Sequence, residues 1–360
     1  LNSPISPAAA EKIGNAVNHL LNAGSRVIDE ATGKEKFVHR YSIRVGKVAY
    51  VAWSREEVEF DLWRLLDRPD PDQVRAMIAQ PLKGNMPNSV SASDFYVLAL
   101  SASAARVVVR DYHETTLDRV RQNIASWFHN LRLIGYDGQP ARPPGIYPLA
   151  ASLFRDANKE MPAHVPTALL AAAVAGRPLP EYLLGLAVKR NVAMQGPFRE
   201  VNGNRTLSLE RLALIKAILE TKEKRNLSAL DPQHPDAAYH CGRLLAVLEQ
   251  IQRAALGEVN ATIVDRYYGA ACASPGTILG NLVNESQAHL SKMRKSTGDG
   301  WAQNRLQDVL SAIGTEFPKT LSLHRQGLFA LGYYHQKAHD KAAAIEAKAA
   351  KQSETENPSA

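Results

Sequence analysis

The sequence is poor in cysteine and in long apolar runs, and each absence excludes a class of protein. Its 360 residues include two cysteines, Cys241 and Cys272, which are too few for a disulfide framework and typical of buried thiols in a reducing cytosol. No apolar run approaches the roughly 20 residues that span a bilayer, and no signal-peptide pattern occurs. The sequence therefore predicts a cytoplasmic protein with no membrane partner.

Residue patterns typical of enzymes are missing as well. No Gly-x-Ser-x-Gly, dinucleotide-binding or phosphate-loop pattern occurs. His335 and His339 have the spacing of a zinc peptidase, but Gln336 stands where such an enzyme needs a glutamate, so we expect a solvated helix face there. Adjacent residues of a helix do not face each other, so His240 and Cys241 predict a buried thiol. The sequence thus predicts no catalytic residue, no metal and no cofactor.

Residues 1–135 predict an α+β region with two β-hairpins. Gly46-Lys47, between Tyr41–Val45 and Val48–Trp53, is a two-residue turn signal. A second hairpin is expected from Asp94–Leu100 and Arg106–Tyr112. The three successive valines of the latter segment, Val107–Val109, predict a strand buried on both faces. Helices are expected at about 7–23, 55–67, 71–81 and 115–134. The strands are too few to predict a sheet of their own and the sequence begins at Leu1 rather than methionine, so we expect a missing N-terminal part to complete it.

After residue 135 the pattern becomes helical. Residues 136–148 predict a turn-rich linker, 149–232 a helical region, 233–345 a C-terminal helical bundle and 346–360 a disordered tail. The fold class expected is therefore mainly α with a small α+β N-terminal region. Residues 207–224 predict an amphipathic helix. On the last helix, Gly327, Ala330 and Gly332 would let a neighbouring helix approach closely.

Two basic groups are candidates for nucleic-acid contact, within a formal net charge of +7 that is spread along the chain. The first is Lys189, Arg190, Arg199 and Arg205, around a loop at Asn202–Asn204 that we expect to be flexible. The second is Lys292, Arg294 and Lys295, followed by glycines and by Trp301 as a stacking platform. Cations beside glycine and amide side chains can grip a phosphate backbone. The alternative is a solvated helix end, where the helix dipole favours cations.

Several stretches resemble one protein family. They are Leu1–Ser6, Ser93–Ser101 followed by Arg106–Asp111, Arg205–Ala217, Tyr239–Leu245 and Gln326–Gln336. In this order they are similar to the large subunit of the type I-C Cascade, a CRISPR surveillance complex. The resemblance implies a C-terminal bundle equivalent to a Cascade small subunit. It also implies an N-terminal part, not present here, that contacts the protospacer-adjacent motif.

The resemblance implies a function in antiviral defence. The chain would be a non-catalytic subunit that supports target DNA binding and R-loop formation. Its partners would be the Cascade backbone subunits, a guide RNA, double-stranded target DNA, the displaced single strand and a helicase-nuclease. Two other classes stay open from the residues alone: a structural helical protein without nucleic-acid contact, and a nuclease completed by the missing N-terminal part.

Overall fold

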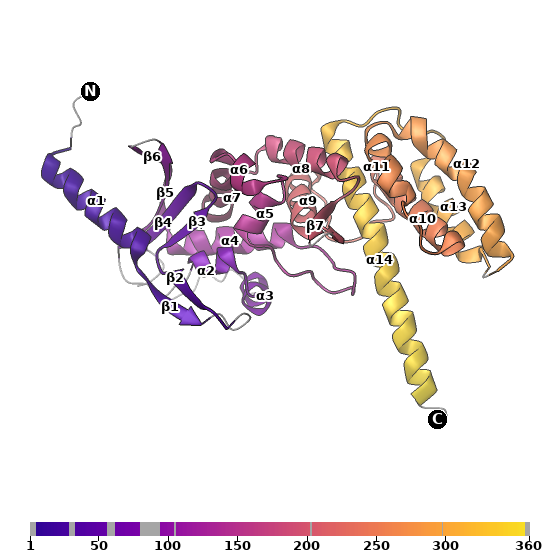
Figure 1. Ribbon diagram of the computed structural model, residues 1–360, viewed down its shortest axis with the longest axis horizontal. Helices are drawn as coiled ribbons and strands as arrows, with labels where there is room; N and C mark the ends of the chain where they lie inside the picture. The colour runs from indigo at the N-terminus through magenta and orange to yellow at the C-terminus, as the bar shows by residue number, and fades with distance from the viewer. Residues whose placement is uncertain are drawn as a thin grey trace. The chain divides into compact units, whose positions relative to one another are not determined.

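A computed structural model describes residues 5–28, 33–55, 62–79, 94–103, 106–201, 204–296 and 298–356. The chain forms two compact units (Figure 1). Unit 1 comprises residues 1–129 and 143–179, and unit 2 comprises residues 130–142 and 180–360. The predicted fold class is confirmed: the described residues are mainly helical, most strands lie in the N-terminal third, and the C-terminal helices pack together. In the described part of the chain, no helix is long and apolar enough to cross a membrane.

Unit 1 is built on a four-stranded antiparallel sheet in the order β3-β4-β5-β6. Its strands are β3 (Ser42–Val45), β4 (Val48–Ser54), β5 (Asp94–Ser103) and β6 (Arg106–Thr116). Both predicted hairpins are confirmed. In the first, Val45 pairs with Val48 and Gly46 has a φ of +60°, which glycine adopts without strain. The expectation that these strands are too few for a sheet of their own was wrong. That a missing N-terminal part completes the sheet stays a prediction.

Helices and a further hairpin complete unit 1. They are α1 (Pro7–Asn22), α2 (Leu62–Asp67), α3 (Pro71–Ala79), α4 (Leu117–Leu131), α5 (Ile146–Ala151), α6 (Ala157–Glu160), α7 (His164–Ala175), β1 (Gly24–Ile28) and β2 (Glu35–His39). The pair β1–β2 was not predicted. Helix α7 covers one face of the sheet, where Thr167 lies 3.1 Å from the hydroxyl of Tyr50. Asn123 of α4 donates to the carbonyl of Val174 at 2.7 Å, which ties α4 to α7.

Strand β6 contradicts the prediction of a strand buried on both faces. Val107 is 72% exposed and Val109 is 60% exposed. The run of valines reflects β-propensity rather than burial, because β6 is the edge strand of the sheet.

Unit 2 contains a short hairpin and a helical bundle. Its elements are α8 (Glu181–Ala193), β7 (Phe198–Val201), β8 (Asn204–Leu207), α9 (Leu209–Glu223), α10 (Ala237–Leu256), α11 (Ile263–Ala273), α12 (Pro275–Arg294), α13 (Gly300–Ile313) and α14 (Leu323–Glu356). Helix α14 lies along α10 and also contacts α8 and α9. The compact unit is thus larger than the bundle predicted over residues 233–345.

Helix α9 is central rather than amphipathic. Nine successive residues, Arg211–Leu219, are buried, including Arg211 and Lys216. The prediction of a helix with one apolar stripe was therefore wrong, because α8 and α14 pack against α9 and every face of this segment is buried.

The crossing of α10 and α14 is as close as the glycines predicted. A Cβ at Gly332 would lie 2.0 Å from the carbonyl oxygen of Tyr239, and one at Gly242 would lie 1.9 Å from that of Phe329. Glycine is required at both positions because each faces backbone atoms of the other helix.

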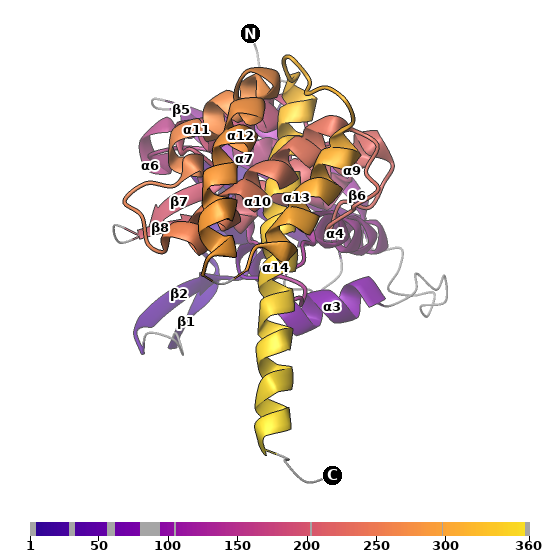
Figure 2. The same ribbon diagram turned by 90° about the vertical axis from the view of Figure 1, so that its right-hand side faces the viewer.

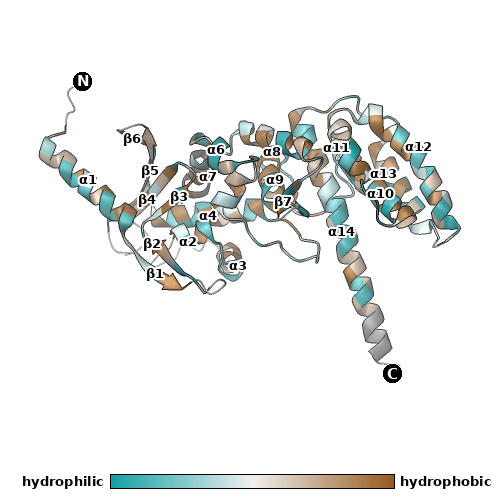
Figure 3. Ribbon diagram, in the orientation of Figure 1, coloured by the Kyte–Doolittle hydropathy of each residue, from teal (hydrophilic) through white to brown (hydrophobic). Residues whose placement is uncertain are grey.

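Two segments of unit 2 differ from expectation. Residues 136–142 were expected to be part of a linker, but Tyr136 packs near-parallel to Tyr334 at 6.0 Å, and the Tyr334 hydroxyl donates to the carbonyl of Ile134 at 2.6 Å. The disordered tail predicted over 346–360 is helical as far as Glu356, and 357–360 lie outside the described residues. This part of α14 projects from the unit in Figures 1 and 2, and the portion of it that is coloured in Figure 3 mixes polar and apolar residues.

Candidate nucleic-acid interface

The first basic group lies at the end of α8 and on the β7–β8 hairpin. A flexible loop was predicted here, but β7 and β8 pair from Phe198–Leu207 to Val201–Asn204. Asn204 begins β8, and residues 202–203 lie outside the described residues. Lys189 is exposed and pairs with no described acidic residue. Arg199 is half exposed, and its Nη1 lies 2.7 Å from Oε1 of Glu210.

Two arginines of this region, Arg190 and Arg199, act electrostatically on a third, Arg211, and we call the three the guanidinium cluster. Arg211, the third member, was missed in the sequence because it lies inside an apolar helix. It is 1% exposed and donates to Oδ1 of Asn191 at 2.8 Å and to the carbonyl of Phe198 at 3.2 Å. Burial first, and then the charges of Arg190 and Arg199, lower the pKa of Arg211 to about 10, although Tyr268 and Glu210 oppose them.

The guanidinium cluster brings several positive charges together. Nε of Arg190 is buried and has no hydrogen-bond partner among the described residues. Among the charges acting on Arg211, Tyr268 and Glu210 oppose those of Arg190 and Arg199. An anion beside Arg190 and Arg199 would offset their repulsion of Arg211. A phosphate oxygen suits guanidinium donors in both charge and geometry.

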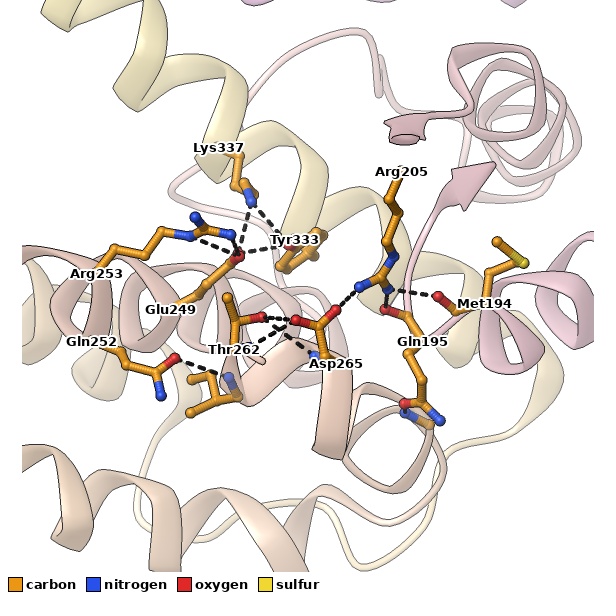
Figure 4. A network of polar contacts seen from close by, with 12 residues as sticks. Met194, Gln195, Arg205, Glu249, Gln252, Arg253, Thr262, Asp265, Tyr333 and Lys337 are labelled. Atoms are coloured by element: carbon orange, nitrogen blue, oxygen red, sulfur yellow. Dashed lines mark hydrogen bonds and ion pairs between the residues drawn. The ribbon is translucent and has the colours of Figure 1, made fainter. Parts of the chain in front are cut away.

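Arg205 is placed differently from the other members of its group. Its guanidinium lies over the ring of Phe198 at 4.1 Å, pairs with Asp265 and donates to the carbonyls of Met194, at 2.6 Å, and Gln195 (Figure 4). These contacts join β8 to the end of α8 and the start of α11. Arg205 therefore holds the hairpin in place and has fewer donors to offer a ligand.

The second basic group lies at the turn between α12 and α13. Lys292 and Lys295 are exposed and pair with no described acidic residue, and we call them the lysine pair. Arg294 is paired with Asp299 at 3.0 Å, and this hydrogen bond is the main cause that lowers the pKa of Asp299. Trp301 begins α13 and is 44% exposed. Figure 1 shows this turn at the far end of α12, away from β7, so the two groups are not brought together.

A buried carboxylate network next to Arg205 was also missed. Glu249 of α10 lies 2.7 Å from Nζ of Lys337 and 2.7 Å from the hydroxyl of Tyr333, and Arg253 donates to it at 3.2 Å (Figure 4). Burial is the largest single influence and favours the neutral form of Glu249, but Lys337, Tyr333 and Arg253 together outweigh it, so the pKa of Glu249 lies below its ordinary value. The network joins α10 to α14. Glu249 and Lys337 are 88 residues apart, so the spacing patterns of a single helix could not reveal this pair.

The residues considered for metal or thiolate chemistry have structural surroundings. Among the described residues, no group of three or more histidine, cysteine, aspartate or glutamate side chains could hold a metal ion. His335 was expected on a solvated face, but it is 1% exposed, and its Nδ1 is hydrogen-bonded to the Tyr239 hydroxyl at 2.8 Å. Cys241 is buried as predicted, and burial raises the pKa of its thiol to about 12.

His335 is expected to make unit 2 sensitive to acid. Burial first, and then the charge of Lys216, lower its pKa to about 3, against about 6.5 in an unfolded chain. Between these values the unfolded chain takes up a proton that the folded chain does not, so stability is complete above pH 6.5 and falls as pH drops toward 3. The loss is about 1.4 kcal/mol per pH unit for one such histidine.

Urea unfolding of the chain and of His335→Gln at several pH values tests this prediction. Glutamine keeps an acceptor for Tyr239 but does not titrate, so the variant should lose stability more slowly on acidification. Burial also lowers the pKa of His234 and His240, so the variant should still show part of the dependence of stability on pH. Equal slopes for the two proteins would contradict the assignment to His335.

Comparison with known proteins identifies the family. A family model described as CRISPR-associated protein (Cas_Csd1) matches residues 1–340. A comparison with curated proteins gives no match. The match covers both units and nearly all of the described residues, and the chain therefore belongs to the Csd1 family of CRISPR-associated proteins, whose members are components of Cascade complexes.

Proposed function

We propose that the chain is the non-catalytic large subunit of a type I-C Cascade and supports target DNA through contacts to phosphates. The observation that carries this proposal is the guanidinium cluster, in which Arg190 and Arg199 act on the buried Arg211 and the buried Nε of Arg190 has no hydrogen-bond partner among the described residues. Contacts to phosphate position a protein on DNA without reading its sequence. Base pairing with the guide RNA then reads the sequence, as in other guided effectors.

The lysine pair provides a second contact in this proposal. Lys292 and Lys295 are exposed cations on one turn, and Trp301 is close in sequence and partly exposed, as a ring must be to stack on an unpaired base. Two separated basic sites suit a strand that follows the surface of unit 2. In this function the chain stabilises the R-loop, holds backbone subunits, and recruits the helicase-nuclease after the DNA has opened.

The expected result of removing these cations is weaker binding of the assembled complex to DNA of any sequence. We expect Arg190→Gln/Arg199→Gln and Lys292→Ala/Lys295→Ala each to lower affinity. Each should reduce the slope of log affinity against log salt by about 0.7–0.9 for every phosphate that the variant no longer neutralises. The slope is measured by titrating the complex with target DNA over a range of salt concentrations.

A matched control separates local contacts from net charge. The double variant Lys319→Ala/Lys348→Ala also removes two positive charges, but from other exposed positions of unit 2, and it should leave the salt slope unchanged. Thermal melting of each free chain shows whether it folds. If both test variants have the same salt slope as the unchanged protein, the substituted cations are solvated side chains at helix ends and the phosphate proposal fails.

A second function is favoured by the internal pairing of several other cations in unit 2. Arg205, Arg294, Arg325 and Lys337 are all held in internal ion pairs. A chain that only joins other subunits would use its charges in this way. An unchanged salt slope together with normal complex assembly would favour this structural function.

A further inference from the structure

Strand β6 has a free edge. It is 11 residues long and forms the end of the sheet, where β5 pairs with one of its edges. Among the described residues, no strand pairs with the other edge. The backbone N–H and C=O groups of a free edge are a template for another strand. Proteins usually protect such an edge with charged side chains or by covering it.

The outer face of β6 is apolar instead. Val107, Val109 and Tyr112 are 72%, 60% and 49% exposed, and a register shift beside Val109 keeps all three on the side of Leu98 and Leu100. The opposite face of β6 is the one that contacts α7. Exposed apolar side chains on an edge strand indicate an interaction surface.

Aromatic rings extend this surface across the sheet. The rings of Tyr112 and Tyr96 are near-parallel, at 21°, with centroids 6.5 Å apart. Tyr96 is followed by Trp53 on β4, at 18° and 5.4 Å. Trp53 and Tyr96 are also register partners. The outer face thus carries a continuous strip of apolar and aromatic side chains from β4 to β6.

The charges beside the strip indicate what covers it. Asp94 and Glu114 both act on Tyr96, whose pKa is raised by desolvation first and then by these two carboxylates. Asp94 is paired with Arg55 at 3.8 Å, which leaves the carboxylate of Glu114 to repel a phosphate backbone. Glu114 is exposed and pairs with no described cation, so it would favour a basic side chain on the partner. An extended polypeptide meets all these conditions, because it supplies backbone hydrogen bonds and alternate apolar side chains.

We propose that β6 receives an added strand from a partner protein of the assembled complex. The added segment has apolar residues at alternate positions, against Val107, Val109 and Tyr112, and a basic residue against Glu114. This inference rests on membership of a multisubunit complex but does not depend on the DNA contacts of unit 2.

Hydrogen exchange tests whether the edge is covered on assembly. Amides of β6 that face the free edge should exchange quickly in the chain alone and at least about tenfold more slowly in the assembled complex, which corresponds to about 1.4 kcal/mol. Protection in the chain alone would mean that the edge is already covered within the chain, and equal exchange in both states would mean that no strand is added. Either result would overturn the proposal.

Substitutions then test the apolar strip. Val107→Lys/Val109→Lys places charges on the edge and should weaken binding of the chain to the complex assembled without it by at least about tenfold. Val107→Thr/Val109→Thr keeps the branched shape and should bind more tightly than the lysine variant. Val27→Lys/Ile28→Lys is the matched control, because Ile28 is also 72% exposed on a strand of unit 1, and it should bind like the unchanged chain.

The outcomes distinguish this proposal from the proposed function and from other occupants. Once saturated with the lysine variant, the complex should keep its salt slope for DNA. A lowered slope would instead mean that nucleic acid lies on β6. Loss of self-association of the free chain in the lysine variant would mean that the occupant is a second copy. Equal loss of binding in the Val27/Ile28 control would mean that added charge alone is responsible.

Discussion

Replacing Gly242 by alanine is expected to lower the free energy of unfolding of unit 2 by about 3 kcal/mol or more. The added Cβ would lie 1.9 Å from the carbonyl oxygen and 2.8 Å from the carbonyl carbon of Phe329. Both atoms belong to the backbone of α14, so no side-chain rotation can relieve the contact. Overpacking of this kind costs about 1–3 kcal/mol when the structure can adjust, and here two long helices would have to separate. Urea unfolding measures the change.

Gly280→Ala, the same substitution at another position, is expected to have the opposite effect on stability. Gly280 lies within α12, and its nearest neighbour would be the ring of Phe317 at 4.0 Å. Alanine there should stabilise the helix by up to about 1 kcal/mol, because glycine has low helix propensity. Gly332→Ala, which meets the carbonyl of Tyr239 at 2.0 Å, should behave like Gly242→Ala. Unfolding curves that coincide for Gly242→Ala and the unchanged protein would show that the helices do not cross here.

The second large effect is expected from Glu249→Gln, which should destabilise unit 2 by about 3 kcal/mol. The substitution keeps the size of the side chain but removes the charge that balances Lys337, whose side chain is 21% exposed. Breaking a buried ion pair by removing one partner costs about 3–5 kcal/mol. The lower end applies because Lys337 is partly exposed and because the new amide oxygen can still accept a hydrogen bond from Tyr333.

Replacing both partners separates the effect of the charges on stability from the effect of side-chain packing. Glu249→Leu/Lys337→Met should be less destabilising than Glu249→Gln, because no uncompensated charge is left. A coupling energy of at least about 1 kcal/mol in the cycle with the two single variants would identify the pair. If Glu249→Gln unfolds at the same urea concentration as the unchanged protein, the carboxylate does not hold α10 and α14 together.

The features that could be predicted from the sequence depend on local or purely steric requirements. Gly46-Lys47 predicted a two-residue hairpin, and the structure has that turn with a positive φ at Gly46. Gly332 predicted a close helix crossing, since only glycine lets two backbones meet. The apolar spacing of the C-terminal helices predicted a bundle, and α10–α14 pack together. In each case a few residues that are close in the sequence determine the feature.

The features that were missed depend on what lies opposite a residue. Val107–Val109 have the same β-propensity whether a strand is central or at an edge, so their exposure could not be predicted. Arg211 is surrounded in sequence by apolar residues, and only the fold brings Arg190 and Arg199 near it. His335 was expected in solvent because its partner, Tyr239, is 96 residues away. The contribution of each candidate phosphate contact remains a prediction for the binding experiments.

The assignment of residues 130–142 to unit 2 has a consequence for synthesis on the ribosome. This segment is made early, yet the hydroxyl that binds the carbonyl of Ile134 belongs to Tyr334, 200 residues later. At roughly 5–20 residues per second, translation takes about 10–40 s to cover that distance. Unit 1, interrupted by the same segment, is complete at residue 179. The nascent chain therefore lacks the partner of the Ile134 carbonyl while the next 200 residues are made, and a chain that ends before α14 would leave this segment without its contacts to Tyr334.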